Sequence, residues 1–87
     1  MPIRAANELF RALRKEIEKK SKYQLHPPTR EVVLTHLDDT EVPFKDGMDE
    51  IALRKAREIA ERRQLRLKSR FDYSYPKFTK LIMEFER

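Results

Sequence analysis

Three cations that alternate along one stretch, Arg66, Lys68 and Arg70, have the clearest chemical potential in this chain. The residues between them include Leu67, and apolar residues at alternate positions predict a β-strand with one buried face. On that strand the three charges stand about 6–7 Å apart on one face, which is comparable with the spacing of successive phosphates in a nucleic acid. Like charges at this distance repel unless an anion covers them, so the pattern predicts contact with a polyanion.

The residues that follow this strand extend the predicted surface. Lysines next to phosphates add point charge, and exposed tyrosines can stack on unpaired bases. The predicted RNA-binding residues are Arg66, Lys68, Arg70, Tyr73, Tyr75, Lys77 and Lys80. Such contacts give affinity and salt dependence but little choice of sequence. The alternative interpretation is that the same basic face packs against acidic residues of a protein partner.

The composition supports a small basic domain without catalytic chemistry. Twenty Lys+Arg against fifteen Asp+Glu give a formal charge of +5 over 87 residues, a balance typical of nucleic-acid binders. The absence of cysteine excludes disulfides, thiolate metal sites and a cysteine nucleophile. With Gly47 as its one glycine, the chain has no Gly-rich phosphate loop, and no nucleophile motif or metal-ligand spacing occurs. We therefore expect no enzyme activity, cofactor, metal or small-molecule substrate, and no apolar run suits a membrane span.

A helix must position the basic strand. The stretch 46–71 predicts one helix that leads directly into the strand. Its apolar residues recur every three or four positions, as on a helix face that packs on a core; they are Ala52, Leu53, Ala56, Ile59 and Ala60. Asp46 or Asp49 is expected to cap this helix. Its arginines are expected to pair within the helix, as in Glu58 with Arg62.

The first segment predicts a second amphipathic helix. We expect it to span residues 1–22 and to present Leu9, Phe10 and Leu13 to a partner's groove or a neighbouring ribonucleoprotein surface. Its arginines resemble those of an organellar targeting sequence, although its glutamates do not. A mature docking helix in a mitochondrial protein, or otherwise a cytoplasmic one, is the favoured interpretation over a cleaved presequence.

The remaining elements complete an α+β arrangement. Adjacent prolines predict an extended linker over 23–30, in which His26 is solvated. Strands are predicted over 31–37, 42–44, 65–71 and 77–86. The expected fold is an α+β domain over 31–87, in which one helix covers a small mixed β-sheet. The acids between the first two strands read as a solvated turn rather than a metal site.

Residues 30–86 resemble the N-terminal domain of bacterial-type translation initiation factor 3. That family's helix and following strand read Ala-x-x-x-Ala-x-x-x-x-Leu-x-Leu, and the spacing recurs at Ala56, Ala60, Leu65 and Leu67. In the family a Pro-x-Val-x-Lys-Ile-Met strand comes next, and here the stretch 76–82, PKFTKLI, falls at the family's distance from the leucine pair; HLDDTEV resembles the family's hairpin.

The chain also departs from that family's pattern. Thr40 stands for the turn glycine, Val42-Pro43 replaces Leu-Gly, and Arg66 replaces an acid, which makes the strand more basic. No counterpart of the family's second domain follows, so the resemblance implies a stand-alone relative of the first domain with an added helix.

The resemblance implies a function in translation. We expect a non-catalytic ribosome-binding protein, either a small mitochondrial ribosomal protein or an initiation-factor-like component. Its partners would be ribosomal RNA and neighbouring ribosomal proteins. The alternative is an assembly adaptor, because Leu9-Phe10-Arg11 is similar to the Leu-Tyr-Arg triplet of the LYR family. LYR proteins are all-helical, whereas the middle of this chain is rich in proline and β-branched residues.

Overall fold

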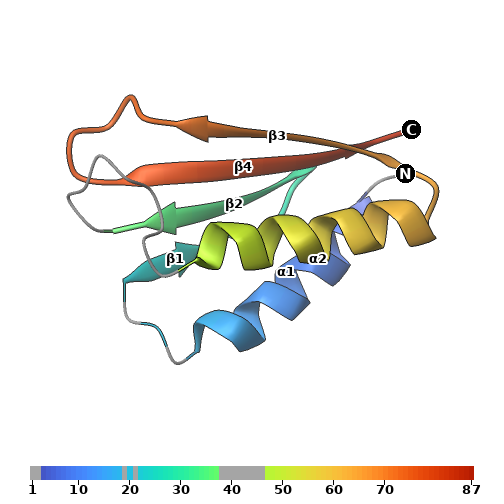
Figure 1. Cartoon of the computed structure of the whole chain (residues 1–87), viewed down its shortest axis with the longest axis horizontal. Coiled ribbons are helices and arrows are strands. Elements are labelled where there is room, and N and C mark those ends of the chain that lie inside the picture. The colour runs from blue at the N-terminus through green and yellow to red at the C-terminus, as the bar shows by residue number, and fades with distance from the viewer. Residues whose placement is uncertain (1–2, 19, 21, 38–46) are drawn as a thin grey trace.

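The computed structural model describes residues 3–18, 20, 22–37 and 47–87. Two helices and four strands follow one another in the order helix, strand, strand, helix, strand, strand (Figure 1). The elements are α1 (Ile3–Ile17), β1 (Tyr23–Leu25), β2 (Glu31–His36), α2 (Met48–Arg62), β3 (Arg66–Asp72) and β4 (Thr79–Glu86). The predicted α+β class is confirmed, and the predicted strand over 42–44 lies outside the described residues.

The four strands form one sheet in the order β1-β2-β4-β3. Every pair of neighbouring strands is antiparallel, so the prediction of a mixed sheet was wrong. The connection from β3 to β4 is a hairpin, and antiparallel pairing follows from such a short link. In contrast to β2 and β4, which lie in the middle, β3 is an edge strand. Among the described residues no strand pairs with the outer edge of β3, so the basic strand has an unpaired edge there as well as an exposed face.

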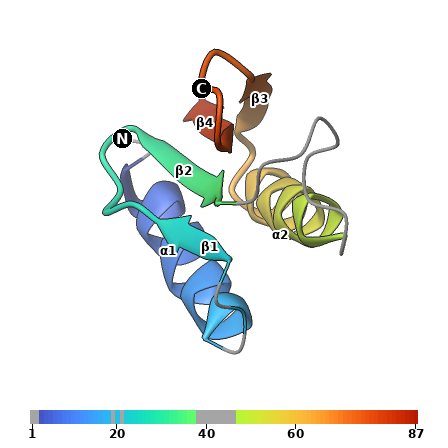
Figure 2. The same cartoon turned by 90° about the vertical axis from the view of Figure 1, so that its left-hand side faces the viewer.

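Both helices pack on the sheet, whereas the sequence predicted one covering helix. Helix α2 contacts β3 and β4, and α1 contacts β1, β2, β4 and α2. Figure 1 shows both helices on the same side of the strands, and the end-on view of Figure 2 shows α1 next to β1. One continuous hydrophobic core joins side chains from both helices and all four strands. No helix or strand in the described part of the chain covers the opposite face of the sheet (Figure 1), hereafter the open face.

Helix α1 is part of this core and not an appended segment. The side chains of Leu9 and Leu13 are fully buried. The predicted contact of these leucines with a partner's groove therefore does not hold in the folded domain, and Phe10 beside them is half-buried. Removing α1 as a targeting segment would take away one wall of the core.

The predicted linker over 23–30 is also partly structured. Its first three residues form β1, which pairs with β2 in the register Tyr23 to His36. His26, expected to be solvated, is half-buried, and its Nε2 lies 2.8 Å from the Thr35 hydroxyl in a hydrogen bond. The chain from α1 to β2 thus belongs to the same domain as the rest.

Ion pairs join the two helices at their exposed edges. The Glu8 carboxylate pairs with Arg62 and, at 2.8 Å, with Arg63, and Lys55 lies 3.6 Å from Glu16. Arg62 had been expected to pair within α2 with Glu58, but its ion-pair partner is Glu8 of α1. Such half-exposed pairs add about 0–1 kcal/mol each. Their larger consequence is to direct both Glu8 and Glu16 toward α2.

The chain contains two successive units of the same layout, each a helix followed by two strands. Because β2 pairs with β4, the second strands of the two units lie side by side in the middle of the sheet. The order of first and second strands is therefore the same from either edge. This internal symmetry was not visible in the sequence. It places the first strand of each unit, β1 and β3, at the two edges of the sheet.

Helix α2 begins after a glycine in the left-handed backbone conformation. Gly47 is the N-cap residue with φ of 80°, and no side-chain hydrogen bond caps the helix, in contrast to the cap predicted from Asp46 or Asp49. Asp46 lies outside the described residues, and Asp49 lies in the first turn, where its charge favours the helix dipole.

Gly47→Val should lower the free energy of unfolding by about 1–3 kcal/mol, because a β-branched residue is strained at positive φ. An added Cβ would meet no atom within 4 Å, so the loss comes from the backbone alone. Urea denaturation followed by far-UV circular dichroism measures it. Gly47→Asn is the control, since asparagine adopts this conformation more readily. Equal stability of Gly47→Val and wild type would contradict the positive φ of Gly47.

Candidate nucleic-acid interface

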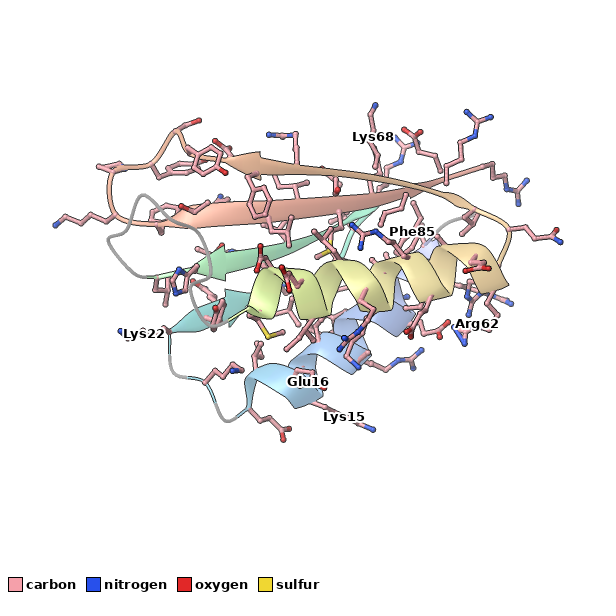
Figure 3. All side chains as sticks on the ribbon, in the orientation of Figure 1. Lys15, Glu16, Lys22, Arg62, Lys68 and Phe85 are labelled. Atoms are coloured by element: carbon pink, nitrogen blue, oxygen red, sulfur yellow. The ribbon has the colours of Figure 1, made fainter. Side chains whose placement is uncertain are left out.

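The open face is built from side chains that alternate with the core residues of each strand. In β3 the core side carries the half-buried Leu67 and Phe71, and in β4 it carries the buried Leu81, Met83 and Phe85. Figure 3 shows Phe85 between the sheet and α2, and Lys68 pointing away from the helices. The open-face residues of the β3–β4 hairpin are Arg66, Lys68, Arg70, Asp72, Lys80, Ile82, Glu84 and Glu86.

At the end of the hairpin that begins β3, the predicted cations face carboxylates. Arg66 is the register partner of Glu86, and Lys68 is the partner of Glu84. The Lys68 Nζ also lies 3.6 Å from a Glu86 oxygen. Cross-strand pairs of opposite charge stabilise a sheet. The glutamates of β4 therefore supply anions that the sequence pattern had been expected to receive from a bound polyanion. Arg66 and Lys68 are therefore weaker candidates for contact with a phosphate, although the Lys68 side chain is 72% exposed.

Arg70 has different surroundings from the other two cations of β3. Its register partner across the hairpin is the apolar Ile82. A hollow of about 220 Å³ lies beside it on the open face, lined by Lys68 and Arg70 as well as Glu31 and Glu84. The mixed charges of this hollow do not favour a phosphate. Arg70 is instead the first of the cations that surround the hairpin loop.

The loop end of the hairpin combines cations with aromatic rings. The rings of Tyr75 and Phe78 stack with centroids 4.5 Å apart and planes 16° apart. The Lys80 Nζ lies 4.7 Å from the Tyr75 centroid and 5.8 Å from that of Phe78, a cation–π arrangement. Lys77 is exposed in the same loop. The hairpin end is defined here as Arg70, Tyr75, Lys77, Phe78 and Lys80.

One carboxylate accompanies these cations. Asp72 accepts hydrogen bonds from the Ser74 hydroxyl and, at 3.0 Å, from the Ser74 backbone N–H. These bonds, followed by the nearby charges of Arg70 and Lys80, lower the pKa of Asp72 below its usual value. The carboxylate therefore stays charged at neutral pH and fixes the turn, while three cations remain around it.

The structure separates the two tyrosines that the sequence grouped together. Tyr75 stacks with Phe78, whereas the Tyr73 ring lies 6.0 Å from that of Phe71, on the core side of β3. Both rings have free area, since Tyr73 is 59% exposed and Tyr75 is 38% exposed. Tyr75 thus belongs to the hairpin end with Lys80, and Tyr73 is exposed beside it as part of another aromatic pair.

Phe78 is the member of the hairpin end that the sequence prediction left out. The alternation of β4 carried the information needed, because Phe78 falls on the same side of the strand as Lys80. Phe78 had been predicted only as part of the strand over 77–86 and not as a binding residue. The position of Tyr75 over this ring could not be read from alternation, since loop residues follow no such period.

Within the described ranges, no three His, Cys, Asp or Glu residues gather as metal ligands would. None of the helices in the described part of the chain is long and apolar enough to cross a membrane. No protein-family model matches the chain, and no curated protein matches it.

Proposed function

We propose that this protein is a non-catalytic RNA-binding component of the translation apparatus that holds an unpaired RNA segment at its hairpin end. The observation that carries the proposal is the stacked pair of Tyr75 and Phe78 with the Lys80 ammonium group over it, in a hairpin end that also carries Arg70 and Lys77. Binding to single-stranded nucleic acid combines the same two interactions, stacking of bases on aromatic rings and attraction of the phosphates to cations.

The geometry favours RNA contact at the loop end of the hairpin over contact at its other end. Lys80 lies over the two rings, Lys77 is exposed in the same loop, and Arg70 lies in β3 two residues before Asp72, the register partner of Lys80. A base stacked on Tyr75 would bring its flanking phosphates toward this end of the hairpin. Toward the other end, Glu84 and Glu86 repel phosphates and offset Arg66 and Lys68. The predicted RNA-binding set is therefore narrowed to its second half, and we expect little sequence preference.

The assignment to translation comes from the resemblance to the N-terminal domain of initiation factor 3. Ribosomal RNA and neighbouring ribosomal proteins are the partners proposed on that basis, with a mitochondrial location. Cosedimentation of the protein with isolated ribosomal subunits, before and after RNase treatment, tests this part. Failure to sediment with the ribosomal subunits would contradict the assignment to translation. RNA binding by the hairpin end is tested separately, with the variants described below.

The adaptor hypothesis has less structural support. It required the apolar stripe of α1 to enter a partner's groove, and Leu9 and Leu13 of that stripe are fully buried against the sheet and α2. A partner could reach them only after α1 left the domain.

Two matched double variants test the hairpin end. Arg70→Gln/Lys77→Gln removes two cations at the loop, and Arg66→Gln/Lys68→Gln removes two that face carboxylates. We expect the first to lower the slope of log K against log salt by about 1.4 for an unpaired RNA oligonucleotide, with a much smaller change for the second. Fluorescence anisotropy at several salt concentrations measures both. Equal slopes for the two variants, or no RNA binding by the wild type, would contradict the proposal.

A further inference from the structure

We propose that the solvent-exposed face of α1 is a second phosphate-binding surface, which takes the backbone of an RNA duplex. This inference goes beyond the proposed function, because it concerns another part of the molecule and does not require the hairpin end to bind. Four exposed cations carry it, here called the α1 cationic face: Arg4, Arg11, Arg14 and Lys15.

These four cations lie on one side of the helix. At about 100° per residue they fall within an arc of about 100°, together with the exposed Asn7 and Glu18. Figure 3 shows Lys15 pointing away from the rest of the domain. From Arg4 to Lys15 the face extends about 16 Å along the axis, which is long enough to meet several phosphates.

The fold gives this face its net charge. By sequence, residues 3–18 hold three glutamates, two in α1 and Glu18 directly after it, which would offset most of the four cations. In the structure Glu8 pairs with Arg62 at the end of α2 and with Arg63 directly after it, and Glu16 pairs with Lys55 of α2. Two of the three acids are thus turned toward α2, and only Glu18 shares the solvent side. The solvent side of α1 therefore carries four cations and one acid, a net positive charge.

The shape and chemistry of the α1 cationic face favour a duplex over an unpaired strand. Binding of unpaired strands uses exposed aromatic rings, and the one aromatic residue of α1, Phe10, is half-buried away from this face. The α-helix fixes where these side chains leave its axis, with a rise of about 1.5 Å per residue, so that the cations form a preorganised row. Arginine forms bidentate contacts with phosphate. Recognition of this kind depends on backbone geometry and not on base sequence.

The position of the α1 cationic face makes it independent of the hairpin end. Helix α1 lies beside β1 at one edge of the sheet, while the hairpin end adjoins β3 at the other edge (Figure 2). The two surfaces therefore cannot be covered by the same short RNA segment. A protein with both would join a duplex to an unpaired strand within one ribonucleoprotein.

The test compares two double variants that are matched in charge and spacing. Arg11→Gln/Arg14→Gln alters the α1 cationic face, and Arg54→Gln/Arg57→Gln alters exposed arginines of α2, also three residues apart. Binding of a blunt 16-base-pair RNA duplex (a length of about one dsRNA-binding site) is measured by anisotropy across a salt series. We expect the α1 variant to lower the log–log salt slope by about 1.4–1.8, and the α2 variant to behave as wild type.

An unpaired oligonucleotide and a poly-glutamate peptide complete the experiment. The α1 variant should bind the unpaired oligonucleotide as wild type does, whereas Arg70→Gln/Lys77→Gln should keep duplex binding. Equal duplex slopes for the α1 and α2 variants would overturn the inference. So would poly-glutamate binding to α1 at least as tightly as the duplex, which would identify an acidic protein as the partner. Neither result would alter the test of the hairpin end.

Discussion

Leu13→Ala should lower the free energy of unfolding by about 2–5 kcal/mol, which is the range for a fully buried leucine that leaves a cavity. Leu13 has no exposed surface and packs in the core shared by α1, α2 and the sheet. A domain of this size has about 4–13 kcal/mol in total, so the loss is a large fraction. Urea denaturation with two independent probes, far-UV circular dichroism and tyrosine fluorescence, measures the change.

The control for this prediction is Arg11→Ala, two residues earlier on the exposed side of the same helix. Its effect on stability should stay within about 0.5 kcal/mol. If α1 were an appended docking helix, Leu13→Ala would leave the main transition unchanged and affect only partner binding. A common shift of both probes would show that α1 unfolds together with the sheet.

Phe85→Ala should destabilise the domain by about 3–5 kcal/mol, as truncation of a buried aromatic side chain does. Phe85 is 2% exposed and lies between β4 and α2. Its register partner on β3 is Leu67, so the cavity would open beneath the basic strand. Thermal unfolding followed by circular dichroism should show a markedly lower midpoint.

Tyr73→Ala is the matched aromatic control, because Tyr73 lies in the same hairpin with 59% of its surface exposed. Its removal should change the midpoint little. A stability loss as large as that of Phe85→Ala would mean that the loop aromatics serve the core and not a ligand. Together the two variants separate the structural aromatic residues of the hairpin from those available for binding.

The local elements of this protein were determined by its sequence. The alternation of Arg66, Lys68 and Arg70 with Leu67 fixed β3 to within a residue at each end, and the three-and-four spacing of Ala52, Ala56 and Ala60 fixed the buried side of α2. These predictions succeeded because a period of two or 3.6 reflects which side chains a single element can bury. The exposed character of the predicted cations followed from the same periods.

The partners of those elements were decided by the tertiary structure. The sequence near Lys68 does not indicate that Glu84 and Glu86 lie next to it, because the strand register depends on the length of the hairpin loop. Likewise Glu8 and Arg62 are 54 positions apart, and their pairing follows from the packing of α1 on α2. Burial of Leu9 and Leu13 within the domain, rather than in a partner, has the same origin.

For the basic stretch around Arg70, the sequence determined that cations would line one strand face at phosphate-like spacing. Only the tertiary structure decided which of them stand directly opposite a carboxylate across the hairpin. Arg66 and Lys68 meet carboxylates of β4, whereas Arg70 meets Ile82 and continues into the loop of Tyr75 and Lys80. The physical reason is that periodicity sets the direction of a side chain, while its electrostatic surroundings come from residues that pairing and packing bring beside it.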